Sequence, residues 1–148
     1  MNITSETSVI FNVCGSYYMI SGERVLDLGE VPDITCKMPN TPNYMTLGKS
    51  FDRLINMIDL GLFLHSENYG NSKGKQLVVL SKPKGVGFIV NKGDTYVQTQ
   101  NTLHFLEVNL PIGKFVSGFY KCDSLPGKII SALNVDELVN DAMRQLNN

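Results

Sequence analysis

Apolar and polar residues follow one pattern twice along this chain. Each copy has two apolar segments joined by a short turn, a long connection, a second hairpin, and then an acidic or amide residue before a short helix. The segments lie at residues 8–13, 17–20, 44–48, 54–58 and 60–64 in the first copy, and at 76–81, 86–90, 115–120, 128–133 and 135–139 in the second. Two similar halves of about sixty residues predict two small β units packed side by side, because one such unit buries too little surface to be firmly stable alone.

The apolar segments are typical of β-strands. Residues 8–13 and 17–20 are rich in β-branched and aromatic side chains, and Cys14–Ser16 between them favours a hairpin turn. In the last hairpin, Pro126 and Gly127 occupy the two central positions that a type II turn favours. The fold class predicted is therefore mainly β.

Helix is predicted where each copy ends. Asp59 is a candidate N-cap for a short helix over residues 60–64. Asn134, with Glu137 three residues later, indicates the start of a C-terminal helix over about residues 135–147. The apolar residues of that helix recur at helical spacing, at Leu138, Ala142 and Leu146.

The segment between the copies is polar and contains glycines without periodicity, so we expect an exposed linker at about residues 66–75. The chain then divides into subdomain one at about 8–65 and subdomain two at about 76–139. Both belong to one domain spanning residues 1–148.

Charge and hydropathy exclude several partners. The 148 residues include 13 basic and 14 acidic side chains, which gives a net charge of -1. Such a balance provides no field that would draw the chain onto nucleic acid or an anionic membrane. No apolar run approaches the roughly eighteen residues of a membrane span, and the N-terminus has no export signal, so we expect a cytoplasmic protein without direct membrane insertion. Cys14, Cys36 and Cys122 lack metal-ligand spacing and are expected to be reduced structural thiols.

No catalytic constellation is apparent in the sequence. His65 and His104 are isolated, and neither belongs to a metal-ligand spacing. The glycines at 85, 87 and 93 do not open a helix as a phosphate-binding loop would, so they are interpreted as turn residues. We therefore expect no enzymatic activity, no metal and no cofactor.

The order of short motifs resembles the CheW-like domain, the chemotaxis coupling protein family. The motifs lie at Val25–Leu28, Met38–Met45, Leu54–Leu60, Lys75–Asn91, Phe115–Phe119 and 132–139 (ALNVDELV), and together they span nearly the whole chain. The resemblance implies two five-stranded β-barrel subdomains and an adaptor without enzymatic activity. Its implied partners are the tip of a methyl-accepting chemoreceptor and the regulatory domain of a CheA-type histidine kinase.

The resemblance also implies a set of protein-binding residues. The family's receptor-contacting strand falls here on Val25, Asp27 and Leu28, although Val25 and Leu28 are equally well explained as core residues. The family's Asn-Leu-Arg-Gly turn is replaced by Lys49-Ser50-Phe51-Asp52, which removes its arginine, and Arg53 supplies a guanidinium only if the turn has shifted. Phe51 is either an exposed anchor for a partner or a side chain folded back onto its own subdomain.

Two other functions fit the sequence. One is a divergent CheW-like scaffold for a non-chemotaxis array, linked to pili or surface motility, or a relative that has lost receptor binding. The other is a small-ligand β-barrel binder, which requires an apolar cavity with a few convergent polar groups at a barrel mouth.

Overall fold

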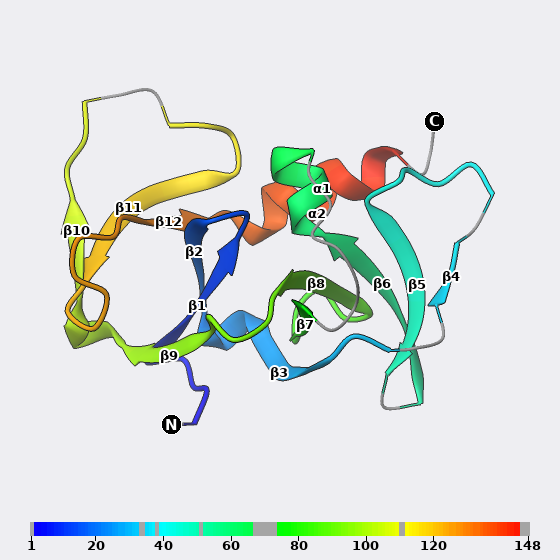
Figure 1. Ribbon diagram of the computed structural model, residues 1–148, viewed down its shortest axis with the longest axis horizontal. Helices are drawn as coiled ribbons and strands as arrows, with labels where there is room; N and C mark the ends of the chain where they lie inside the picture. The colour runs from blue at the N-terminus through cyan, green and yellow to red at the C-terminus, as the bar shows by residue number, and fades with distance from the viewer. Residues whose placement is uncertain are drawn as a thin grey trace.

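The computed structural model describes residues 2–32, 35–37, 39–50, 52–66, 74–109 and 112–145 (Figure 1). Its strands and helices follow the order predicted for the two copies. The elements are β1 (Thr7–Val13), β2 (Ser16–Ser21), η1 (Gly22–Arg24), β3 (Val25–Glu30), β4 (Thr35–Cys36), β5 (Met45–Ser50), β6 (Arg53–Asp59), α1 (Leu60–His65), β7 (Lys75–Leu80), β8 (Val86–Asn91), β9 (Tyr96–Thr99), η3 (Gln100–Thr102), β10 (Leu103–Leu106), β11 (Val116–Cys122), β12 (Ile130–Leu133) and α2 (Val135–Arg144).

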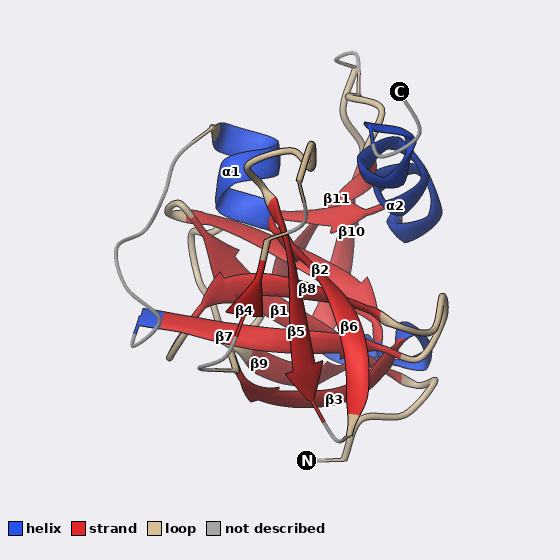
Figure 2. Cartoon of the chain, turned by 90° about the vertical axis from the view of Figure 1, so that its right-hand side faces the viewer, coloured by secondary structure: helices blue, strands red, loops and turns tan. Residues whose placement is uncertain are grey.

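The strands form two six-stranded sheets. Sheet A has the order β10-β11-β12-β2-β1-β9, and sheet B has the order β3-β7-β8-β6-β5-β4. Both α-helices lie on the same side of the molecule, above the strands (Figures 1 and 2). The prediction of a mainly β fold with two β subdomains and a C-terminal helix is confirmed, with six strands in each sheet where five were expected.

The two copies of the pattern exchange their first hairpins. β2 of the first copy pairs in parallel with β12 of the second, and β8 of the second copy pairs in parallel with β6 of the first. Sheet A therefore contains β1 and β2 together with β9 to β12, whereas sheet B contains β3 to β8. The two sheets do not follow the sequential division into residues 8–65 and 76–139, because internal similarity in a sequence does not reveal which copy completes which sheet.

The short helix η1 carries the chain from sheet A to sheet B. Its first residue, Gly22, is buried, and a Cβ atom there would collide with the carbonyl oxygen of Thr4. A glycine is required at this crossover because the backbone of the N-terminal segment approaches it closely.

The largest hydrophobic core lies between the two sheets. We call it the central core; it takes side chains from β1 and β2 of sheet A, from β6 to β8 of sheet B, and from α2. In β1, Val9, Phe11 and Val13 face this central core, whereas Ile10 faces a separate core within sheet A. A strand buried on both faces needs consecutive apolar residues, which residues 9–11 provide in the middle of β1.

Each helix begins at the N-cap predicted from the sequence. The Asp59 carboxylate accepts a hydrogen bond from the Leu62 amide at 3.2 Å, and the Asn134 side chain accepts one from the Glu137 amide at 3.2 Å. Asp59 also forms an ion pair with Lys75, at 3.0 Å between carboxylate and ammonium, where both side chains are mostly buried. The predicted end of the C-terminal helix, including Leu146, lies outside the described residues.

We predict that the two caps differ in their contribution to stability. Asn134→Ala should lower the free energy of unfolding by about 1 kcal/mol, since it removes one capping hydrogen bond. Asp59→Ala should cost about 2 kcal/mol or more, because it also removes the carboxylate paired with Lys75. Urea unfolding of both variants, with Asp59→Asn as the variant that keeps a capping oxygen, measures the difference. Equal losses for the two alanine variants would show that the ion pair contributes nothing.

The exchange of hairpins predicts that neither half of the chain folds alone. Fragments 1–66 and 74–148 should each lack a cooperative unfolding transition, because the central parallel pair of each sheet joins the two halves. An equimolar mixture should recover the β-sheet signal in circular dichroism. Cooperative unfolding of either fragment alone would contradict this interpretation and restore the sequential division.

Candidate functional site

A groove opens at one end of sheet B, which we call the sheet B groove. It encloses about 580 Å³. Three segments form its walls: the start of β3, the hairpin between β5 and β6, and the end of β7 with the turn into β8. The lining residues are Leu26, Asp27, Ser50, Arg53, Ile55, Val79, Leu80, Ser81, Lys84 and Gly85.

A β-bulge at the start of β3 shapes the first wall. Val25 pairs with Leu80 and Asp27 pairs with Val79, so Leu26 has no partner opposite it. A bulge interrupts the regular alternation of side chains between the two faces of a sheet. Leu26 is accordingly 59% exposed and faces the groove, whereas Val25 is only 6% exposed and belongs to the central core.

The bulge also separates the residues of the predicted receptor-contacting strand. Asp27 lines the sheet B groove, and its carboxylate accepts a hydrogen bond from the Leu28 amide at 2.8 Å. Leu28 is half-buried and packs against the central core. Val25 and Leu28 thus pack toward the central core, as their interpretation as core residues implies, and their part in protein binding stays a prediction.

The hairpin between β5 and β6 brings Arg53 to the same groove. Ser50 pairs with Arg53, so only residues 51 and 52 connect the strands. Asp52 has a positive φ of 60°, as tight two-residue hairpin turns require. Asp27 and Arg53, 26 positions apart in the sequence, thus line one groove. Phe51 lies outside the described residues.

The groove combines apolar lining with charged lining residues. Leu26, Ile55, Val79 and Leu80 provide the apolar part, and Asp27, Arg53 and Lys84 provide the charges. Within the described part of the chain, neither Arg53 nor Lys84 forms an ion pair. An apolar surface edged by available cations is suited to bind an apolar side chain flanked by carboxylates.

Aromatic side chains occupy the equivalent end of sheet A. When the two copies are aligned on Asp59 and Asn134, Lys128 is the equivalent of Arg53. β9 borders β1 in sheet A as β3 borders β7 in sheet B, and in this register Tyr96 takes the place of Asp27. In sheet A the aromatic ring of Tyr96 packs against the local core, as do Tyr17 and Leu125. The repeat therefore provides an internal comparison: where sheet B has Asp27 in a groove, sheet A has Tyr96 packed against its local core.

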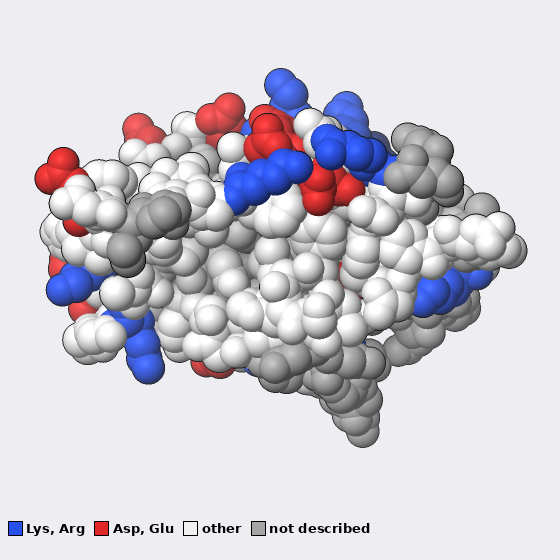
Figure 3. Space-filling model, turned by 90° about the horizontal axis from the view of Figure 1, so that it is seen from above, with Lys and Arg blue, Asp and Glu red and all other residues white. Residues whose placement is uncertain are grey.

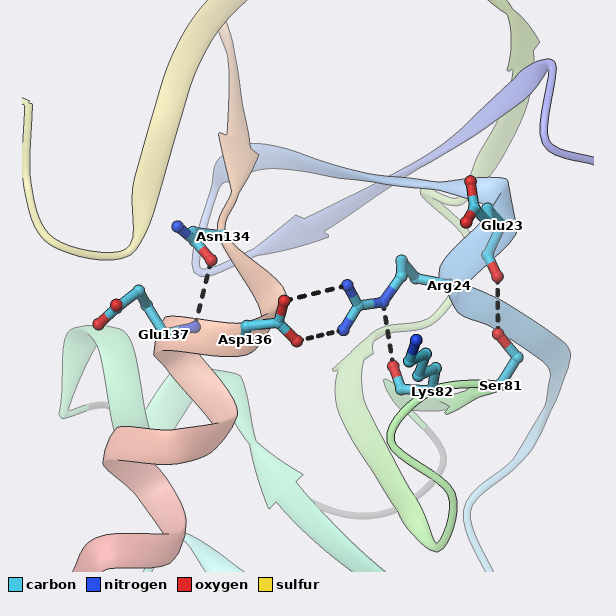
Figure 4. A network of polar contacts seen from close by, with 7 residues as sticks. All are labelled: Glu23, Arg24, Ser81, Lys82, Asn134, Asp136 and Glu137. Carbon is cyan, nitrogen blue, oxygen red and sulfur yellow. Dashed lines mark hydrogen bonds and ion pairs between the residues drawn. The ribbon is translucent and has the colours of Figure 1, made fainter.

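Arg24 connects the groove to α2 and was not identified from the sequence. Its guanidinium forms a bidentate ion pair with Asp136, at 2.5 and 3.3 Å, and its Nε donates to the carbonyl of Lys82 at 3.1 Å (Figure 4). Hydrogen bonding to Asp136 raises the pKa of Arg24, and the same contact lowers the pKa of Asp136. The two residues are 112 positions apart, and no local pattern in the sequence relates them.

Both histidines contact a neighbouring side chain. The Tyr18 hydroxyl lies 2.7 Å from His65 Nε2, and burial raises the pKa of Tyr18. His104 lies 2.8 Å from Asp123 on the surface. Among the residues that the structure describes, no three His, Cys, Asp or Glu side chains are grouped to hold a metal ion. Within the same residues, no helix is long and apolar enough to cross a membrane.

The face that carries the helices has charges of both signs. In Figure 3, which looks down on this face, basic and acidic side chains lie together along one border, and most of the remaining surface is uncharged. On α2, Asp141 pairs with Lys114 at 2.9 Å and with Arg144 at 3.3 Å. Paired charges of opposite sign do not form the basic stripe that nucleic-acid binding needs.

Comparison with known proteins establishes the fold. No protein-family model matches the sequence, and no curated protein matches it. The crystal structure of the scaffolding protein TtCheW from Thermoanaerobacter tengcongensis is similar to this structure with a TM-score of 0.66 and 21% sequence identity, over 88% of this chain and 90% of that chain. This chain therefore has a CheW-like fold, as its motifs implied.

We predict that two apolar residues of the groove respond differently to truncation. Leu26→Ala should change the free energy of unfolding by no more than about 0.5 kcal/mol, because the bulge leaves this side chain exposed. Ile55→Ala should cost about 2–5 kcal/mol, because Ile55 is 3% exposed and belongs to the core of sheet B. Chemical unfolding measures both. A large loss at Leu26 would mean that the groove is closed by this side chain in solution.

Proposed function

We propose that this protein is a cytoplasmic, non-enzymatic adaptor that couples chemoreceptors to a CheA-type histidine kinase. The sheet B groove is the receptor site in this proposal. The single observation that carries it is the presence of Asp27 and Arg53 in one groove, since these are the two charged residues that the family resemblance associates with receptor contact.

The chemistry of the groove supports a protein ligand. A helical receptor tip offers apolar side chains on one face with charged residues beside them, and the groove has matching features in Leu26, Asp27 and Arg53. Arg53 stands next to the position of the family's arginine and retains its planar guanidinium, which binds carboxylates in a bidentate manner. Asp27 retains the acidic charge of the receptor-contacting strand.

The kinase requires a second surface, because an adaptor must hold both partners at once. Sheet A presents Phe105 at 64% exposure on its edge strand β10, and Ile129 at 58% exposure just before β12. Exposed aromatic and aliphatic side chains are typical anchors of protein interfaces. We assign the kinase regulatory domain to sheet A, where it packs sheet against sheet, so that the adaptor works by fixing the distance between receptor and kinase.

A small-ligand binder is the second candidate, and one specific observation favours it. The groove has apolar residues with a few polar groups at the end of a sheet, as ligand sites commonly do. A scaffold for a pilus or surface-motility array would use the same two surfaces with other partners. Binding of a receptor tip separates the leading proposal from both.

We predict that charge reversal in the groove weakens receptor binding without changing stability. Asp27→Lys and Arg53→Glu should each lower the affinity for a peptide hairpin from a cognate receptor tip by about tenfold or more, since each places the wrong charge at the edge of the contact. Calorimetric titration and thermal melting of the same samples provide both measurements.

Lys128→Glu is the matched control, because Lys128 is the equivalent of Arg53 in the second copy and lies in sheet A's hairpin turn, away from the groove. It should leave receptor affinity unchanged. Equal affinities for wild type and both groove variants would remove the receptor site from this groove. A loss of melting temperature in Asp27→Lys would assign Asp27 to the core.

A further inference from the structure

Two walls of the sheet B groove are joined at Arg24 and its neighbour. The carbonyl of Arg24 accepts a hydrogen bond from the Ser81 amide at 2.9 Å, and the carbonyl of Glu23 accepts one from the Ser81 hydroxyl at 2.7 Å. Arg24 immediately precedes β3, which provides Leu26 and Asp27 to the groove, and Ser81 begins the turn that provides Lys84 and Gly85. The junction therefore extends the β3–β7 ladder by one contact and sets where the β7–β8 turn leaves β3.

The side chain of Arg24 strengthens the same junction. Its Nε donates to the Lys82 carbonyl at 3.1 Å, so the guanidinium reaches across to the β7–β8 turn. A guanidinium is planar, and its donors have fixed relative directions. The orientation of the plane therefore decides whether the Nε–H points at Lys82.

Asp136 fixes that orientation. Its two carboxylate oxygens accept from the two terminal nitrogens of Arg24, opposite the edge that contacts Lys82 (Figure 4). Asp136 is the second residue of α2, and α2 is held against the central core by Val135, Leu138, Val139 and Ala142. The carboxylate thus projects from a well-anchored helix start, whereas Arg24 lies on the short crossover η1.

We propose that Asp136 is a positioning residue for the sheet B groove: through Arg24 it sets the relative placement of the β3 wall and the β7–β8 wall. The consequence for receptor binding rests on the function proposed above. The positioning itself does not.

The small contribution that a surface ion pair makes to the free energy of unfolding distinguishes a positioning role from a stabilising one. The Asp136 side chain is 68% exposed, and exposed pairs contribute little to the free energy of unfolding. Bidentate geometry adds directional constraint more than stability. Loss of Asp136 should therefore leave the melting temperature nearly unchanged while the groove changes shape.

Amide chemical shifts in ¹H–¹⁵N spectra provide the test on the full chain without a partner. Asp136→Asn should shift the amides of Leu26, Asp27, Ser81, Lys84 and Gly85, and Asp136→Glu should restore a substantial part of the wild-type shifts because it keeps the carboxylate. Arg24→Lys should reproduce the effect of Asp136→Asn, because an ammonium cannot contact Asp136 and the Lys82 carbonyl in the same planar arrangement.

Asp141→Asn is the matched control, because Asp141 also lies on α2 and also forms an ion pair, with Lys114 at 2.9 Å, but it does not contact Arg24 or the groove. It should leave the five groove amides unshifted. Shifts confined to α2 and η1 in Asp136→Asn, or groove shifts of equal size in Asp141→Asn, would overturn the proposal.

Receptor-tip affinity is measured on the same variants. Asp136→Asn should weaken binding about three- to tenfold, with recovery in Asp136→Glu. Wild-type protein that binds no receptor tip refutes the proposed function, and the amide shifts then decide the positioning proposal alone. A receptor-binding wild type matched by an equally tight Asp136→Asn variant would overturn the role of the positioning in recognition, while the amide shifts would still decide the positioning itself.

Discussion

The parallel pairing of strands between the two copies is the constraint on which this structure depends. β2 pairs with β12 and β8 pairs with β6, so the centre of each sheet is a contact between residues that lie far apart in the chain. These central strands contribute to the central core between the sheets through Tyr18, Ile20, Ile58, Val86, Phe88, Val90 and Leu133. The relative placement of the sheets is therefore not a loose docking of two subdomains. It follows from the same hydrogen bonds that form each sheet.

Departures from the repeat distinguish the two ends of the molecule. The copies have equivalent strands and capped helices, yet Asp27 and Arg53 stand where the second copy has Tyr96 and Lys128. Tyr96 packs on the local core of sheet A, whereas the bulge in β3 turns Leu26 outward and leaves a groove in sheet B. The same arrangement of strands thus presents different surfaces at its two ends, an asymmetry that suits the proposed adaptor with two different partners.

The sequence predicted the local elements well because their signals are local. The N-caps Asp59 and Asn134 and the turn at Pro126 and Gly127, with Gly127 at a φ of 77°, depend on neighbouring residues alone. The exchange of hairpins was not predictable, because either edge of an apolar strand can accept either partner. The outward direction of Leu26 was not predictable for a related reason: a bulge inserts one extra residue into a strand, and no residue type in Val25–Leu28 indicates it.

Arg24 connects the packing of the two sheets with the geometry of the sheet B groove. It belongs to the crossover between sheets, and it contacts both the start of α2 and the turn that borders the groove. Because α2 packs on the central core, a change in the relative placement of the sheets would move Asp136 and, with it, the guanidinium that aligns the groove walls. The pairing that builds the fold and the geometry of the candidate receptor site are therefore coupled through one side chain. A rigid coupling of this kind suits the proposed adaptor function, in which the position of one partner is transmitted to another.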